Sequence, residues 1–129
     1  MTLIKEIADY ISTKIAGTVL GMNLFADLFP EDVSNCTMIT EIMSKGIAPE
    51  LIFSRIYITT RNESLTNAHA NSRAIASELH HLKQDVLTNY RVNYVICESG
   101  PIKQPEVVTI NGKKVFAFIT TFIVYYEEK

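Results

Sequence analysis

The stretch VVTINGKKVFAFITTFIVYY, residues 107–126, predicts a β-hairpin. Asn111-Gly112 separates two apolar runs, and this dipeptide is a strong hairpin signal because both central turn positions need a positive φ. The first strand is Val107–Ile110 and the second runs from Lys114 to Tyr126. The second strand is apolar on both faces, so a sheet with helices on one side leaves its other face to another sheet, another subunit or a ligand. A partner chain is the economical cover, and a sheet that curls within the monomer is the alternative.

Two helices are predicted upstream from apolar residues spaced three and four apart. The first is capped by Thr2, carries its stripe over residues 3–15 and ends at Gly17. The second begins after Ser64 and keeps its apolar stripe over residues 65–87, which is about six turns.

Four further strands are predicted from short apolar or β-branched runs. Polar turn formers, Gly and Pro separate them, in the segments 27–35, 44–49, 61–64 and 98–105. The predicted strands are residues 18–25, 36–43, 51–60 and 92–97.

The resulting order is α-β-β-β-α-β-β-β, which predicts one α+β domain over residues 1–129 with a mixed, mainly antiparallel sheet of about six strands packed against two helices. A chain of 129 residues, 47% hydrophobic and 20% charged, has the composition of a compact domain. The net charge of −2 lacks the cationic field that supplies non-specific nucleic-acid affinity. No apolar run reaches the roughly 18 residues of a membrane-spanning helix, so we expect a soluble intracellular protein without membrane contact.

Residues able to carry chemistry do not form a recognisable motif. The sequence has no nucleophile motif, Gly-rich phosphate loop or zinc signature, so we expect no enzyme, no catalytic residues, no cofactor and no metal. Cys36 and Cys97 are too few for a disulfide scaffold and are interpreted as buried thiols on strands. His69 and His80 share one helix face about 16 Å apart, which favours a solvated surface over a metal pair.

Several local marks lie in the predicted order: Met22-Asn23-Leu24-Phe25, Asn35-Cys36, Arg55-Ile56-Tyr57-Ile58, Ser99-Gly100-Pro101, and the strand from Gly112 to Tyr126 followed by Glu-Glu-Lys. In this order and spacing the chain resembles the small tail terminator proteins of long-tailed bacteriophages, often labelled minor capsid proteins. The resemblance implies a ring, typically a hexamer, that sits on the end of the tail tube, stops its polymerisation and joins the tail to the head connector. It implies as partners the chain itself, the tail tube protein and the head-tail connector protein, with DNA passing through the ring without specific binding. The implied location is the head-tail junction of the virion, and the host cytoplasm during assembly.

Protein contacts are the expected use of the remaining candidate residues. The loops 44–49, 61–64 and 99–105 are the natural contacts with tube or connector. The aromatic side chains are candidates for subunit contacts, with core packing as the alternative for each. The candidate interface residues are Arg55, Tyr57, Ser99, Gly100, Pro101, Phe116, Phe118 and Phe122.

Two other functions stay open. One is a head-completion or connector protein of the head-tail junction, which would bind the portal side and leave tubes uncapped. The other is an α/β regulatory module that binds a small ligand between sheet and helices.

Overall fold

A computed structural model describes residues 2–27, 30, 32–48, 51–80, 82 and 86–129. Within these residues the chain forms two helices and six strands in the predicted order, and the predicted α+β class is confirmed. The elements are α1 (Leu3–Lys14), β1 (Leu24–Ala26), β2 (Cys36–Ala48), β3 (Leu51–Asn62), α2 (Leu65–His80), β4 (Tyr90–Lys103), β5 (Val108–Ile110) and β6 (Lys113–Glu128).

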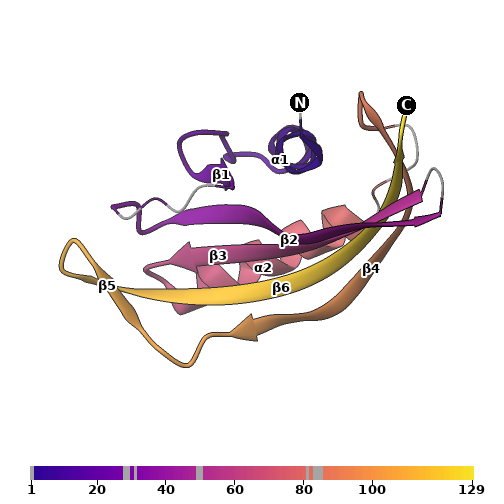
Figure 1. The fold of residues 1–129 in the computed structure, drawn as a ribbon. Coiled ribbons are helices and arrows are strands. Elements are labelled where there is room, and N and C mark those ends of the chain that lie inside the picture. The colour runs from indigo at the N-terminus through magenta and orange to yellow at the C-terminus, as the bar shows by residue number, and fades with distance from the viewer. Residues whose placement is uncertain (1, 28–29, 31, 49–50, 81, 83–85) are drawn as a thin grey trace.

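The strands form a curved sheet in the order β1-β2-β3-β6-β4, and β5 pairs with the first part of β6 (Figure 1). Among the strands of the described residues, β1 and β2 alone are parallel; β2 with β3, β3 with β6, and β6 with β4 are antiparallel. The predicted hairpin is confirmed, since Asn111 (φ 53°) and Gly112 (φ 76°) form the turn between β5 and β6. This places the longest and most apolar strand between two neighbours over most of its length.

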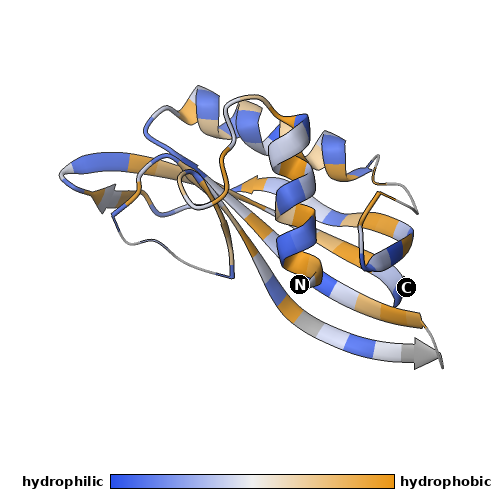
Figure 2. Ribbon diagram, turned by 90° about the horizontal axis from the view of Figure 1, so that it is seen from above, coloured by the Kyte–Doolittle hydropathy of each residue, from blue (hydrophilic) through white to orange (hydrophobic). Residues whose placement is uncertain are grey.

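Both helices lie over the same face of the sheet (Figure 2). Thr2 accepts a hydrogen bond from the backbone N–H of Lys5 and caps α1, as predicted. Alternate residues of the strands point toward the helices, so one contiguous core forms between the layers. Its largest fully buried members include Ile4, Ile7, Ile11, Ile39, Ile56, Ile58, Leu79 and Phe122.

Three predicted boundaries near the start of the sheet are wrong. Of the strand expected at residues 18–25, only Leu24 and Phe25 belong to β1, because the Asn23 side chain accepts from Val19 N–H and donates to the Gly17 carbonyl, fixing a turn. The break expected at 44–49 is instead strand up to Ala48, because these residues pair with β3 and two bulges keep the strand in place. Residues 49 and 50 lie outside the described part. The loop expected at 61–64 starts two residues later, because β3 runs to Asn62.

The second helix is shorter than predicted. It ends at His80, and Leu82 N–H bonds to the Leu79 carbonyl in a tighter turn. Leu82 and Leu87 are buried all the same, so the apolar stripe continues in non-helical backbone. The rest of the predicted stretch includes residues 81 and 83–85, which lie outside the described residues.

The loop expected at 98–105 is also wrong up to residue 103, because β4 continues to Lys103. Register shifts after Cys97 and after Ser99 accommodate Gly100, whose φ is 100°, beside β6. Ser99, Gly100 and Pro101 therefore lie in an edge strand, and the Gly100-Pro101 peptide is cis. Neither described helix is long and apolar enough to cross a membrane.

Candidate protein interface

The sheet face that points away from the helices is only partly covered within the monomer, and we call it the open face. It is formed by alternate side chains of β3, β6 and β4, as the registers of these strands define. Its large apolar members include Tyr57, Tyr94, Ile96 and Ile102, with exposed fractions of 40%, 62%, 37% and 53%. The members of the open face include Phe53, Arg55, Tyr57, Thr59, Ile119, Thr121, Ile123, Tyr125, Glu127, Arg91, Tyr94, Ile96, Glu98 and Ile102.

A small second cluster covers only the corner of this face near β1. Phe25, Cys36 and Met38 are buried there, with Val33 packed against them. A curled sheet that buries both faces within the monomer, the alternative left open by the sequence, is therefore not what the structure shows.

An aromatic row crosses the open face. The ring centroids of Phe53 and Tyr125 are 6.1 Å apart, and those of Tyr125 and Tyr94 are 6.3 Å apart. Beside this row lies an open, shallow hollow of about 420 Å³, lined by Leu51, Asn93, Tyr94, Ile96 and Tyr125. Aromatic side chains are enriched at the centres of protein interfaces.

Within the described part of the chain, two ion pairs lie on this face, Arg55–Glu98 among the apolar side chains and Arg91–Glu127 at one end of the sheet. Arg55 Nη2 is 3.0 Å from Glu98 Oε2, and the two side chains are 32% and 41% exposed. Arg55 Nε is buried and has no hydrogen-bond partner among the described residues. Because the two charges neutralise each other, this pair adds no net charge to the open face.

The structure separates the candidate interface residues into two groups. Arg55 and Tyr57 lie on the open face, and Ser99, Gly100 and Pro101 lie on the edge strand β4. Phe122 is fully buried and Phe118, 7% exposed, lies 5.2 Å from the His69 ring of α2. Core packing, the alternative given for each aromatic, thus applies to Phe118 and Phe122, and neither offers its ring to a partner.

Phe116 is partly buried at the hairpin end of the sheet. Sequence reasoning missed Tyr94, Ile96, Ile123 and Tyr125 as surface residues. The strand-period alternation in residues 92–97 carried a signal for the first two, because it sets Tyr94 and Ile96 on one face.

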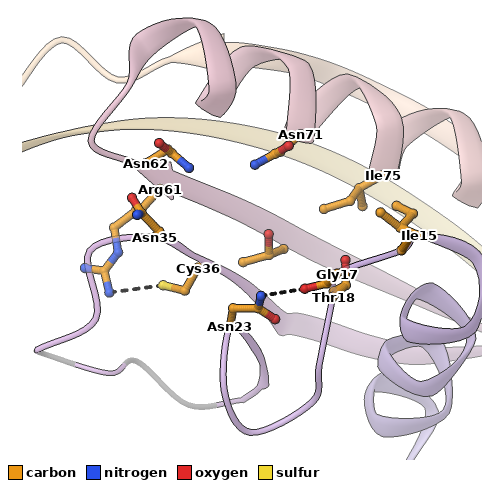
Figure 3. A pocket seen from close by; sticks show the side chains of 12 residues that line it. Ile15, Gly17, Thr18, Asn23, Asn35, Cys36, Arg61, Asn62, Asn71 and Ile75 are labelled. Carbon is orange, nitrogen blue, oxygen red and sulfur yellow. Dashed lines mark hydrogen bonds between the residues drawn. The ribbon is translucent and has the colours of Figure 1, made fainter.

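A second hollow, of about 190 Å³, lies on the helix side (Figure 3). Asparagine side chains dominate its polar lining, from Asn23 in the turn before β1, Asn35, Asn62 and Asn71. Arg61 uses its Nη2 on the Pro30 carbonyl, at 2.6 Å, and on Cys36 Sγ, at 3.6 Å. This hollow offers neutral amide groups, which suit water or a small polar molecule.

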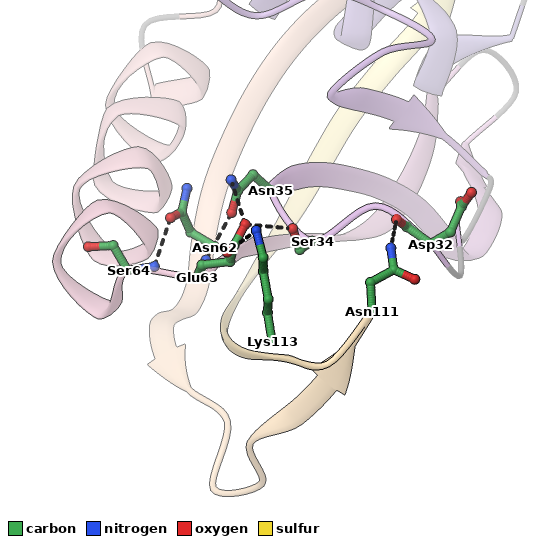
Figure 4. A network of polar contacts seen from close by, with 8 residues as sticks. All are labelled: Asp32, Ser34, Asn35, Asn62, Glu63, Ser64, Asn111 and Lys113. Carbon is green, nitrogen blue, oxygen red and sulfur yellow. Dashed lines mark hydrogen bonds and ion pairs between the residues drawn. The ribbon is translucent and has the colours of Figure 1, made fainter.

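Polar contacts fasten the β5–β6 turn to the segment before β2 (Figure 4). Glu63 accepts from Ser34 Oγ at 2.9 Å and from Asn35 Nδ2 at 3.3 Å, and lies 3.4 Å from Lys113 Nζ. The Ser34 hydrogen bond, followed by the Lys113 contact, lowers the pKa of Glu63 against the opposing effect of desolvation. Asn111 Nδ2 donates to the Asp32 carbonyl at 3.1 Å. This network holds the hairpin in place.

The two thiols have different environments. Cys36 is buried, as predicted, but Cys97 is exposed because its strand lies at the sheet edge, so that part of the prediction is wrong. Cys97 Sγ lies 3.8 Å from the Ser99 carbonyl oxygen and 3.9 Å from the Gly100 carbonyl oxygen, and desolvation raises the pKa of the thiol. Among the described residues, no three His, Cys, Asp or Glu side chains are grouped to hold a metal ion.

No protein-family model and no curated protein matches this chain.

Proposed function

We propose that this protein is a non-enzymatic assembly protein that associates with itself into a ring, and that its role is that of a phage tail terminator. The observation that carries the proposal is the open face, a sheet surface with exposed apolar side chains whose Arg55–Glu98 and Arg91–Glu127 charges are paired. Contiguous apolar surface of this kind marks interaction sites in soluble proteins. Full burial of a free aliphatic or aromatic side chain contributes about 1.5–3 kcal/mol, and covering the part of these side chains that is still exposed supplies a fraction of that for each.

Self-association fits the rest of the surface. Outward residues of α2, such as Asn67, Asn71 and Arg73, are polar and exposed, in contrast to the apolar side chains of the open face. The ring would stop the tail tube from growing, present its other side to the head connector and let DNA pass without specific binding. The net charge of −2 favours such passage over a grip on phosphates. We propose the head-tail junction of the virion as its location, after assembly in the host cytoplasm.

The proposal is tested by imaging the full chain at high concentration by negative-stain electron microscopy, alone and mixed with polymerising tail tube protein. We expect rings alone, and capped tubes of fixed length in the mixture. A uniformly monomeric protein that leaves tubes uncapped would contradict the proposal. Rings that bind the connector protein and leave tubes uncapped would favour a head-completion role instead.

The asparagine-lined hollow favours a second candidate, a small-ligand-binding module. Such a module would stay a monomer or dimer and would gain thermal stability with a polar metabolite. A metabolite screen read by the melting temperature, run beside sedimentation analysis, separates the two candidates.

A further inference from the structure

We infer that neighbouring copies join edge to edge, with β4 of one copy pairing antiparallel with the free part of β2 in the next. The inference rests on the proposed assembly into a ring and names a second contact between neighbouring copies, in addition to the contact that covers the open face. It starts from backbone groups at the two sides of the sheet, which the open face does not involve.

Among the described strands, β4 forms one edge of the sheet and β2, partly covered by β1, lies near the other (Figure 1). Strand β4 is the outermost strand on one side and pairs only with β6. On the other side, β1 covers β2 only at Thr37–Ile39, and no other described strand pairs with the outer edge of β2 beyond that point. A row of free N–H and C=O groups is a template for another strand.

Bulges restrict pairing to one regular segment on each edge. In β4, register shifts follow Val92 and Cys97 and leave Tyr94–Cys97 regular. In β2, shifts between Glu41 and Met43 and between Gly46 and Ala48 leave Met43–Gly46 regular. The two segments have the same length, four residues.

Three residues of each segment, Tyr94–Ile96 and Met43–Lys45, also lie at the same level of the sheet. Following the paired residues from strand to strand across the sheet leads from β2 at one side to β4 at the other, with no shift along the strand direction. The connecting rows are Met43-Arg55-Ile123-Ile96, Ser44-Ser54-Val124-Val95 and Lys45-Phe53-Tyr125-Tyr94. A rotation about an axis parallel to the strands therefore brings the two edges together without a slide. Heterologous contacts without a slide can close into a ring, whereas a slide gives a helical filament.

Strand direction agrees with this junction. Each of β2, β3, β6 and β4 is antiparallel to the one before it in the sheet, so β4 runs opposite to β2. When two copies of the same orientation lie side by side, β4 of one meets β2 of the next in antiparallel fashion. The alternation within each sheet then continues across the junction.

The side chains at the junction are complementary. Tyr94, which is 62% exposed, lies at one end of the paired residues Lys45-Phe53-Tyr125-Tyr94, and Lys45 is exposed at the other end. Residues paired in one row point to the same face, so the junction places Lys45 of one copy beside Tyr94 of the next. An ammonium group over a tyrosine ring is a favourable cation–π contact.

Hydrogen exchange at single-residue resolution tests the inference, with the full chain compared as dilute monomer and as concentrated assembly. Because neighbouring residues of a strand direct their N–H groups to opposite edges, we expect alternate amides of Tyr94–Cys97 and of Met43–Gly46 to slow at least about 10-fold on assembly. Rings without this protection would overturn the inference and leave the ring function standing. Protection in β4 alone would overturn it in favour of a β4–β4 dimer, and a chain that stays monomeric with fast exchange at both edges would overturn both proposals.

Two adjacent proline variants provide a second measurement. Of Ile96→Pro and Cys97→Pro, one removes an N–H bonded to β6 and the other removes an N–H that points away from the sheet. Ile96→Ala and Cys97→Ala control for the lost side chains, both of which are exposed. The proline variant that loses the outward N–H should keep the melting temperature of its alanine control. Its association constant should be at least about 10-fold lower than that of the control, because it lacks a hydrogen-bond donor for the next copy. Assembly equal to that of the alanine control would overturn the inference.

Discussion

Arg55 Nη2 donates to Glu98 Oε2 at 3.0 Å, so an ion pair joins β3 to β4 across β6 on the open face. Both side chains keep about a third or more of their surface exposed, and ion pairs in such positions contribute about 0.2–1 kcal/mol to folding. The pair matters more for association. If a partner covers the open face, an Arg55 without its carboxylate would lose hydration with no compensating charge.

Glu98→Gln is therefore expected to lower the free energy of unfolding of the monomer by less than about 1 kcal/mol and to weaken assembly by a larger amount. Urea denaturation of the dilute protein measures the first effect, and sedimentation at rising concentration measures the second. Glu106→Gln, at an exposed position outside the open face, is the matched control. A variant that loses several kcal/mol of monomer stability and assembles normally would contradict this prediction.

Tyr57→Lys should abolish assembly and leave the monomer folded. Tyr57 is 40% exposed in the monomer, so its replacement should change monomer stability by less than about 1 kcal/mol. A lysine in the centre of a covered apolar surface has to be desolvated, and this opposes association. The control is Val107→Lys, because Val107 is similarly exposed, at 45%, before the hairpin strand. Sedimentation and electron microscopy of both variants check the prediction, which fails if they assemble alike.

Phe122→Ala should destabilise the monomer by about 3–5 kcal/mol, because Phe122 is completely buried between the sheet and the helices. Phe116→Ala, at a partly buried position on the same strand, should destabilise by about 1–2 kcal/mol. Urea denaturation of the two variants gives the comparison. Equal losses would show that the end of β6 near the hairpin is packed as tightly as its centre.

Local signals made the hairpin and the first helix predictable. Asn111-Gly112 adopts the positive φ angles that its turn requires, and Thr2 supplies the cap that opens α1. The double apolar character of residues 115–126 likewise predicted a face in need of cover. The assignment of single aromatics to one face or the other could not be predicted, because it depends on register: Phe122 pairs with Ile56 and is buried, whereas the neighbouring Ile123 pairs with Arg55 on the open face.

Element ends were less predictable because distant parts of the chain decide them. Residues 44–46 contain turn formers, yet β3 pairs with them and keeps them in strand. The apolar stripe that predicted a helix up to residue 87 is real, but Leu82 and Leu87 reach the core from irregular backbone. Tertiary packing overrides local preference at both places.

Gly100→Ala should be strongly destabilising. An added Cβ would lie 2.5 Å from the Ile119 carbonyl oxygen and 2.9 Å from Thr120 Cα, and the φ of 100° is one that side chains rarely adopt. Strain and overlap together should lower the free energy of unfolding by more than about 2 kcal/mol. Gly46→Ala is the matched control within a strand, since no atom lies within 4 Å of its added Cβ. Thermal melting of the two variants measures the difference, and similar melting temperatures would show that β4 relaxes away from β6 there.

Glu63 should make folding stability depend on pH under acidic conditions. Its pKa in the folded state is lowered from the ordinary value of 4.5, first by the Ser34 hydrogen bond and then by Lys113, while desolvation acts in the opposite direction. A group with a lowered folded pKa stabilises the fold above its unfolded pKa, and this contribution is lost as the pH falls through the folded value. Glu63→Gln should therefore have a lower melting temperature than the natural protein at neutral pH, and this difference in melting temperature should disappear on acidification.

NMR titration of the Glu63 carboxyl carbon should show a higher pKa in Ser34→Ala and in Lys113→Ala. Lys114→Ala is the control, because it removes the same charge at the next position of β6, on the opposite side of the strand. An equal rise of the Glu63 pKa in this variant would mean that general surface charge, and not the contacts to Ser34 and Lys113, sets this pKa.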